Sequence, residues 1–139
     1  MGNIDAGNLI ERWHAYMVAN DPALLDAMVA DDAVFKSPAV HRPQQGKALV
    51  IKYLTAAMHV LNNGSFRYVE EWAGDRSAVL EFALEIDGIE IEGIDMIRWN
   101  DAGLITSFTV MMRPLKALNT VIPLMAAVLQ SGAAQAVQA

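Results

Sequence analysis

The sequence predicts an α+β fold in which helices pack against one face of an antiparallel sheet. Apolar residues recur at helical spacing as far as Leu61. Four runs rich in β-branched and aromatic residues follow between residues 66 and 114, and short turns separate them. An apolar stretch with helical character then begins at Leu115. Because helices precede the strand meander, we expect a strongly curved sheet that wraps around the first and third helices.

Three helices are expected before the meander. The first covers residues 5–19, where apolar side chains repeat at helical spacing. The second covers residues 22–30 and starts with Pro22, which is favoured at the first position of a helix. A short β-prone run at 31–38 separates it from the clearest helix, at 47–63, which ends in an Asn-Gly stop signal.

Four strands are expected at residues 66–73, 77–86, 90–99 and 104–114. In the second strand, apolar residues alternate with Glu81 and Glu85, so these glutamates should lie on the outer face of the sheet. Asp87-Gly88 is a two-residue hairpin signal between the second and third strands. Turns this short join antiparallel neighbours.

The last helix is expected at about residues 115–130. It is apolar on more than one side, so it should be buried against another element or against a second subunit. Pro123 falls inside it and should kink or split it. We expect a loose tail at 131–139. Since no repeat or linker is visible, the sequence predicts one domain over residues 1–139, with its core at about 5–114.

The composition excludes several classes of function. The chain has 139 residues, 54% of them hydrophobic, with a formal net charge of −6 and no cysteine. A chain without cysteine has no disulfide, thiolate nucleophile or zinc–thiolate site. The acidic balance argues against nucleic-acid binding, and no apolar run approaches the length that spans a membrane. We see no signal peptide and expect a cytoplasmic protein.

Asp95 is the most informative residue, because it lies on an otherwise apolar face of the strand at 90–99. A buried polar group without a partner costs about 1–3 kcal/mol, so a structural Asp95 should bond Trp13, Ser37 or a buried water. The alternative is a pocket acid whose pKa is raised by desolvation and which donates a hydrogen bond to a ligand. Both interpretations stay open at this point.

The strings "ADDAVFKSP", "GIDMIRWNDAGLI" and "VMMRP", with Gly46 before the long helix, resemble the nuclear-transport-factor-2-like superfamily. The best match is its SnoaL-like and ketosteroid-isomerase-like branch. This resemblance covers about residues 9–114. It implies a cone-shaped, barrel-like fold with an apolar pocket between the concave sheet and the helices. It also implies a homodimer across the sheet. Members include isomerases, dehydratases, cyclases, epoxide hydrolases and binding proteins, so fold alone does not give function.

The catalytic set of ketosteroid isomerases is only partly retained. Asp95 matches the strand carboxylic acid of these enzymes. Ser37 stands at the position of the general-base aspartate, Trp13 at that of the first-helix tyrosine, and Leu54 at that of a third-helix aromatic. Serine has no basic group near neutral pH, so the resemblance does not extend to ketosteroid isomerase activity. The acid of the cyclases and the Arg–Asp triad of the epoxide hydrolases are not assembled either.

The other candidates follow from position and from the implied pocket. His41 lies in the loop after the short strand, where a histidine could supply a missing acid or base or could simply be exposed. Seven residues are expected to contact a ligand: Trp13, Met17, Ser37, Leu54, Met58, Phe108 and Met112. The three histidines have no metal-ligand spacing, so no metal or cofactor is expected.

Three hypotheses of function remain. The leading one is a SnoaL-like domain that binds a small, mostly hydrophobic molecule in an internal pocket. The second is an enzyme of the isomerase, dehydratase or cyclase type, with Asp95 as acid or oxyanion-stabilising donor and His41 as base. The third is a non-catalytic dimerisation module. They differ in whether a cavity reaches Asp95 and whether a second titratable group lies near it.

Overall fold

A computed structural model of the chain describes residues 6–131. Residue 5, at which the first helix was expected to begin, lies outside the described residues, and so does the expected tail after Ser131. The elements are α1 (Ala6–Ala19), α2 (Pro22–Asp26), β1 (Val29–Lys36), β2 (Gln44–Gln45), α3 (Lys47–Leu61), β3 (Arg67–Ala73), β4 (Ser77–Ile86), β5 (Ile89–Trp99), β6 (Ile105–Arg113) and α4 (Leu115–Ser131).

The strands form one six-stranded sheet in the order β2-β1-β6-β5-β4-β3. β3 to β6 are a continuous antiparallel meander, as the sequence predicts. β1 joins the open side of β6 in parallel, and β2 pairs with β1. The α+β prediction is confirmed, although the sheet is mixed rather than wholly antiparallel. β3 is one edge of this sheet, and within residues 6–131 it pairs only with β4.

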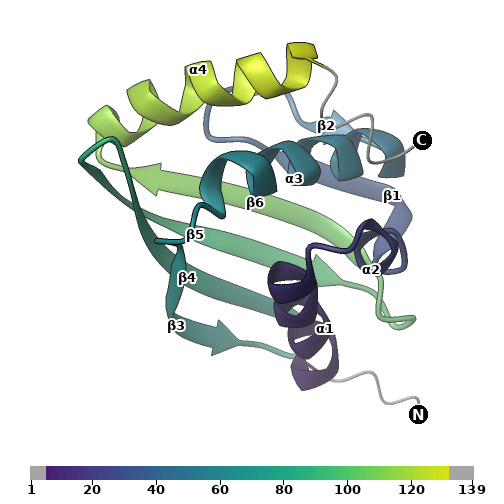
Figure 1. The fold of residues 1–139 in the computed structure, drawn as a ribbon. Coiled ribbons are helices and arrows are strands. Elements are labelled where there is room, and N and C mark those ends of the chain that lie inside the picture. The colour runs from purple at the N-terminus through teal and green to yellow at the C-terminus, as the bar shows by residue number, and fades with distance from the viewer. Residues whose placement is uncertain (1–5, 132–139) are drawn as a thin grey trace.

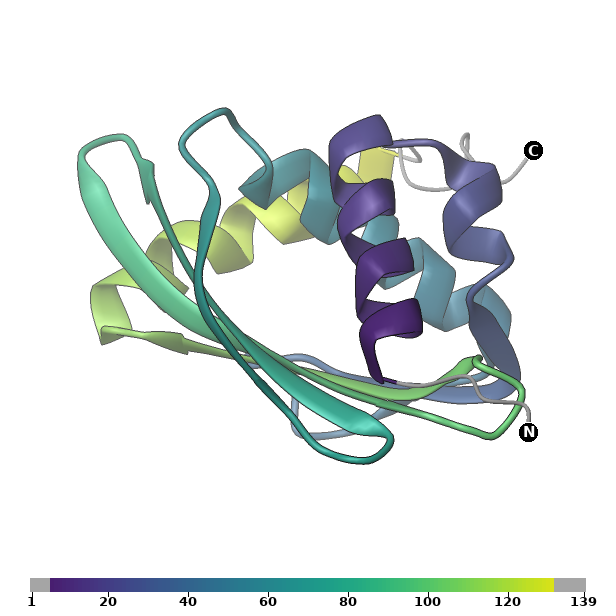
Figure 2. The same cartoon turned by 90° about the horizontal axis from the view of Figure 1, so that it is seen from below.

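The four helices gather on one side of the curved sheet. α3 and α4 cross over the strands, whereas α1 and α2 lie towards one end (Figure 1). The view from below shows the sheet curving around them, with the helices on its inner side (Figure 2). The curved sheet and the helices therefore form the predicted cone-shaped fold, and its core lies between them.

In the central strand β4, buried side chains alternate strictly with more exposed ones, and this alternation fixes which face of the strand lies against the core. Along β4, every second residue from Ala78 to Ile86 is buried, while the residues between them are more exposed. The β4–β5 connection is the predicted hairpin, because Asp87 (φ 50°) and Gly88 (φ 80°) both adopt positive φ, as a tight primed turn requires. This turn sets the register that pairs Leu80 with Asp95.

α2 and β1 differ from their predicted bounds. The helix was expected to run to residue 30, but it ends at Asp26, and β1 begins at Val29. Val29 pairs with Ile105 of β6. This strand pairing outweighs the local helical spacing that predicted helix at Val29 and Ala30. α4, in contrast, is one continuous helix across Pro123, so the proline does not split it.

Within residues 6–131, none of the helices is long and apolar enough to cross a membrane.

Candidate functional site

Asp95 lies on the inner face of β5 and is only 7% exposed. Its direct neighbours across the sheet are Leu80 on β4 and Val110 on β6, both buried and apolar. An ionised carboxylate in such surroundings loses the hydration that stabilises its charge. The site is therefore organised around a carboxyl group that a solid apolar core would not tolerate without a partner.

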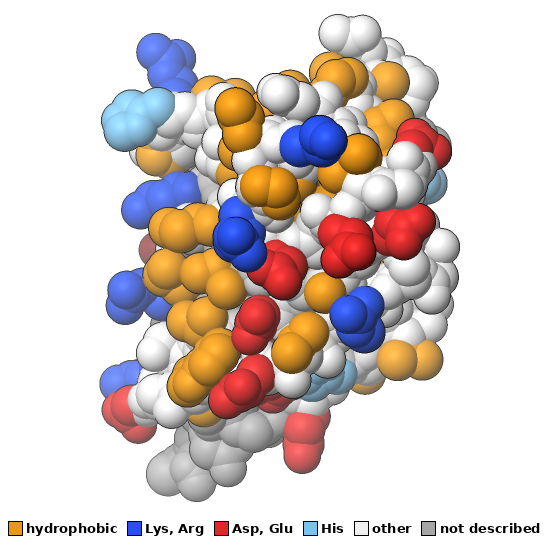
Figure 3. Space-filling model, turned by 90° about the vertical axis from the view of Figure 1, so that its left-hand side faces the viewer, with side chains coloured by type: hydrophobic (Ala, Val, Ile, Leu, Met, Phe, Trp, Pro, Cys, Tyr) orange, Lys and Arg blue, Asp and Glu red, His pale blue; other side chains and the backbone are white. Residues whose placement is uncertain are grey.

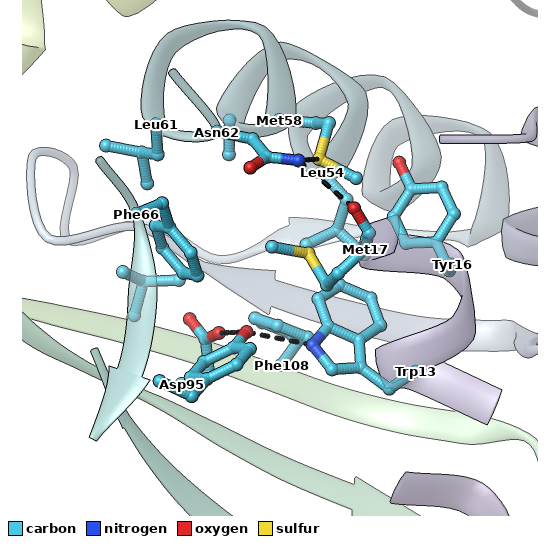
Figure 4. Close-up of a pocket in the computed structure, with 13 residues that line it drawn as sticks. Trp13, Tyr16, Met17, Leu54, Met58, Leu61, Asn62, Phe66, Asp95 and Phe108 are labelled. Atoms are coloured by element: carbon cyan, nitrogen blue, oxygen red, sulfur yellow. Dashed lines mark hydrogen bonds between the residues drawn. The ribbon is translucent and has the colours of Figure 1, made fainter. Parts of the chain in front are cut away.

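The partner of Asp95 is Tyr68, which comes from the edge strand β3. The Tyr68 hydroxyl donates a hydrogen bond of 2.6 Å to Asp95 Oδ2. The indole Nε1 of Trp13 in turn donates to the Tyr68 oxygen at 2.9 Å. Three elements, α1, β3 and β5, thus meet in one hydrogen-bonded row (Figure 4). Trp13 was one of the three partners expected for a structural Asp95, but it acts one step away, through Tyr68.

Phe82 and Phe66 hold Tyr68 in place from the sheet side. Phe66 stacks on Phe82, with ring centroids 5.2 Å apart, and meets Tyr68 edge to face at 5.1 Å. Phe82 can occupy this position because residue 93, opposite it on β5, is glycine. A Cβ at Gly93 would lie 2.4 Å from Phe82 Cζ and 2.5 Å from the carbonyl oxygen of Met111. Gly93 therefore makes the room that the aromatic support of Tyr68 needs.

A second contact between α1 and β3 lies nearer the surface. His14 Nε2 is in contact with the Glu71 carboxylate, and the His14 ring meets the Tyr68 ring edge to face. Both partners are more than a third exposed, so this pair stabilises the fold by at most about 1 kcal/mol. Its role is geometric, because it holds the helix and the edge strand together beside the buried row.

Burial sets the proton affinities in this row. Desolvation raises the pKa of Asp95 from 3.8 to about 7, and the hydrogen bond from Tyr68 opposes part of that rise. Desolvation, followed by the charge of Asp95, raises the pKa of Tyr68 well above its usual 10. At neutral pH, Asp95 thus exists in both protonation states, while Tyr68 keeps its proton. A carboxyl group with a pKa near 7 is suited to giving and taking protons at that pH.

Asp95 and Tyr68 line a cavity of about 40 Å³ between the sheet, α1 and the C-terminal half of α3. Figure 4 shows Asp95 on one side of it, with Met17 and Met58 facing it from the helices. Five of the seven residues expected to contact a ligand line this cavity: Trp13, Met17, Leu54, Met58 and Phe108. Asn62 closes the α3 side, where its side chain donates to the Met17 carbonyl.

Tyr16 and Tyr68 also belong to the site, although the sequence did not single them out. Tyr16 lines the cavity, and burial raises the pKa of its hydroxyl to about 12, so it too stays protonated. Tyr68 comes two residues after Phe66, which directly precedes β3, and the two rings are in contact. This period-two spacing of aromatic residues is the signal that could have identified Tyr68.

The other two expected ligand residues, Ser37 and Met112, line a second and larger cavity of about 160 Å³ beneath α4. The two cavities share Ala57, Leu61 and Val110 as lining residues, so they adjoin. Ser37 Oγ accepts a hydrogen bond from the Ala39 backbone N–H of its own loop. Ser37 is therefore not a partner of Asp95, contrary to one of the expectations.

His41 has no place beside Asp95. Its side chain is exposed in the loop after β1, and it lines neither cavity. The arrangement in which His41 supplies a base to Asp95 is therefore not what the structure assembles. Within residues 6–131 no group of three or more acidic or histidine side chains could hold a metal ion.

Comparison with known proteins places this site in a family. A family model for the SnoaL-like domain matches residues 10–108, which include Trp13, Tyr68 and Asp95. No match was found among curated proteins.

Solved structures agree with that match. A steroid delta-isomerase from Pseudomonas aeruginosa is 36% identical, with a TM-score of 0.85 over 93% of this chain and 94% of that one. A bacterial protein with a cystatin-like fold from Silicibacter pomeroyi is 28% identical, with a TM-score of 0.81 over 90% and 87% of the two chains.

A SnoaL-like polyketide cyclase from Shewanella putrefaciens, described as putative, is 13% identical over 77% of this chain and 79% of that one. Its TM-score of 0.59 shows a shared fold only. The family match spans most of the chain and contains the whole Trp13–Tyr68–Asp95 row. The chain therefore belongs to the SnoaL-like domain family.

Proposed function

We propose that the protein binds a small, mostly hydrophobic molecule that carries a carbonyl or hydroxyl oxygen. The observation that carries this proposal is the position of Asp95 in the wall of an otherwise largely apolar cavity. Tyr68 occupies Oδ2, and among the described residues no hydrogen bond is made to Oδ1. A ligand oxygen that bonds Oδ1 would supply the hydrogen-bond partner that this atom lacks.

The protonation state of Asp95 decides which oxygen it prefers. As a neutral acid, Asp95 donates to a carbonyl oxygen, and as a carboxylate it accepts from a hydroxyl. Its pKa of about 7 makes both states accessible near neutral pH. The low polarity of the surrounding walls strengthens either hydrogen bond relative to one in water.

Acetophenone, a small ketone with one aromatic ring, tests this proposal. Its dissociation constant would be measured by NMR titration between pH 5.5 and 8.5. We expect binding to weaken about tenfold per pH unit above pH 7, as Asp95 loses the proton that it donates. Asp95→Asn should remove this pH dependence, whereas Asp31→Asn, at an exposed position of β1, should retain it. Equal pH profiles for wild type and Asp95→Asn would contradict the proposed contact.

A second candidate function is proton transfer on such a ligand, by an isomerase, dehydratase or cyclase type of reaction. The pKa of about 7 at Asp95 favours it, and so does the 36% identity to the protein described as a steroid delta-isomerase. Because Tyr68 holds its proton and His41 lines neither cavity, Asp95 alone would take a proton from one carbon and return it to another. Tyr68 would then act as a positioning donor.

Exchange of the acetophenone methyl hydrogens in D₂O would test for proton transfer by Asp95. If Asp95 removes such a proton, the wild-type protein should exchange them about 10²–10⁴-fold faster than Asp95→Asn at equal occupancy. Asp31→Asn would serve as the control for a change of net charge. Exchange at the buffer rate in every protein would leave ligand binding as the function and exclude this reaction.

The expected homodimer is also part of the proposal, as is a cytoplasmic location. Trp72 and Met111 are about half exposed and, with Ile94, line an open groove on the outer face of the sheet. Figure 3 shows one side of the molecule, where groups of hydrophobic side chains alternate with acidic and basic ones. Light scattering would give the mass in solution. Trp72→Lys should convert a dimer through this face into a monomer, and the dimer proposal fails if the wild type is already monomeric.

A further inference from the structure

The cavity beneath α4 has a different character from the one that contains Asp95. It holds about 160 Å³ and is lined almost entirely by apolar side chains, among them Leu118, Val121 and Met125 of α4. Its hydroxyl-bearing residues are Ser37, which already accepts a bond from its own loop, and Tyr53. Nothing in this lining would hold a charge, so the cavity suits hydrocarbon.

The two cavities meet next to Asp95. Val110 is the direct neighbour of Asp95 on β6 and lines both of them. Across from Val110, Ala57 and Leu61 also line both, and they share one face of α3 because they are four residues apart. The boundary between the two cavities is thus apolar. On the α3 side it consists of the Leu61 side chain and the single methyl group of Ala57.

Volume limits what each cavity can hold. A cavity of about 40 Å³ is too small for a ring, so it accommodates an oxygen and one or two carbons. An apolar cavity of about 150 Å³ is known to bind benzene, and the α4 cavity is of that size. Together they match one ring that carries an oxygen function on a short arm.

We propose that the α4 cavity is the subsite for the hydrocarbon body of the ligand, and that the ligand is a single-ring ketone or alcohol rather than a four-ring molecule. The proposal rests on the proposed contact of the ligand oxygen with Asp95. α4 begins at Leu115, beyond the segment 10–108 that matches the SnoaL-like domain. The helix therefore sets ligand size with residues that the family match does not include.

Two neighbouring alanines of α4 allow a matched test. Ala126 and Ala127 are both exposed, but only Ala126 lines the cavity. Ala126→Phe should put a ring into the subsite and weaken acetophenone binding at least about tenfold, because the ligand loses apolar burial. Ala127→Phe should leave the affinity unchanged. Ala57→Phe, at the boundary of the cavities, should act like Ala126→Phe. Thermal unfolding of each free variant would confirm that it folds.

Ligand size is tested with 4-androstene-3,17-dione, a four-ring enone. We expect acetophenone to bind at least about tenfold more tightly than this steroid. Equal or tighter binding of the steroid would overturn the size limit. Wild-type affinity for acetophenone in both Ala126→Phe and Ala57→Phe would overturn the subsite.

Failure of the subsite and failure of the polar contact give different results. If Ala126→Phe weakens acetophenone binding but Asp95→Asn leaves its pH profile unchanged, the subsite stands and the Asp95 contact fails. If Asp95→Asn removes the pH dependence but Ala126→Phe and Ala57→Phe bind normally, the contact stands and the subsite fails. Backbone amide shifts in α4 on titration with acetophenone provide an independent readout, and their absence would count against the subsite.

Discussion

Replacing Asp95 by asparagine should change how the stability of the protein depends on pH. In the folded protein, desolvation raises the pKa of Asp95 from 3.8 to about 7. Between these pH values the native state holds a proton that the unfolded chain has lost. The free energy of unfolding therefore falls as pH rises from about 4 to about 7, and the loss is complete above pH 7. At about 1.4 kcal/mol per tenfold change in proton affinity, this contribution is about 4 kcal/mol.

Asparagine has a similar shape and can accept the same hydrogen bond from Tyr68, but it never ionises. Urea unfolding of both proteins at pH 4.5, 6, 7 and 8.5 gives the difference in their unfolding free energies, in which the other titrating groups cancel. Relative to wild type, we expect the unfolding free energy of Asp95→Asn to rise by about 3 kcal/mol between pH 4.5 and 8.5, the part of the whole contribution that this range covers. A difference that stays within 1 kcal/mol across this range, or that changes in the opposite direction, would refute the raised pKa. Asp31→Asn should track the wild type.

Three further substitutions test the parts around the site. Tyr68→Phe should cost about 1–3 kcal/mol in urea unfolding, since it leaves buried polar groups unpaired. It should also raise the pKa of Asp95 above 7, as read from a ¹³C carboxyl titration, because the lowering hydrogen bond is gone. Gly93→Ala should destabilise the fold by about 1–3 kcal/mol and change the near-ultraviolet circular dichroism as Phe82 is displaced; an unchanged spectrum would argue against that contact. Pro123→Ala should raise the free energy of unfolding by up to about 3 kcal/mol, because alanine restores a helical N–H donor. Thermal unfolding would show this as a higher melting temperature.

The fold could be predicted where local signals agree with one another. β4 begins and ends at the predicted residues, 77 and 86, because alternation, Asp87-Gly88 and strand propensity all point to the same element. The parallel pairing of β1 with β6 could not be predicted in this way. It joins residues about 75 positions apart, as Val29 and Ile105 show, and local periodicity carries no information on such partners. β2 is only two residues long and follows Pro43, so the prolines and glycine around it indicate a loop and not a strand.

Asp95 could be predicted because a carboxylate is out of place on an apolar face. Tyr68 could not be identified by that argument, since a tyrosine on a strand is ordinary. Its importance comes from the tertiary structure, in which Tyr68 of β3 reaches past β4 to the carboxyl group of Asp95 on β5. His41 shows the opposite case. Its residue type suggested acid–base chemistry, but exposure in a loop removes it from the site. Sequence thus indicates unusual residues, while their partners depend on tertiary pairing.

The position of Tyr68 on an edge strand has a consequence for dynamics. Among the described strands, β3 is hydrogen-bonded only to β4. Its register shifts between Tyr68 and Glu70, and most of its side chains are exposed. Such a strand is among the first parts of a domain to open in local unfolding, so its amide hydrogens should exchange faster than those of β5. The donor to Asp95 is therefore supplied by the least secured strand of the meander. When β3 opens, Asp95 loses Tyr68 and meets water, so this opening gives the Asp95 proton a route of exchange with solvent besides the cavity.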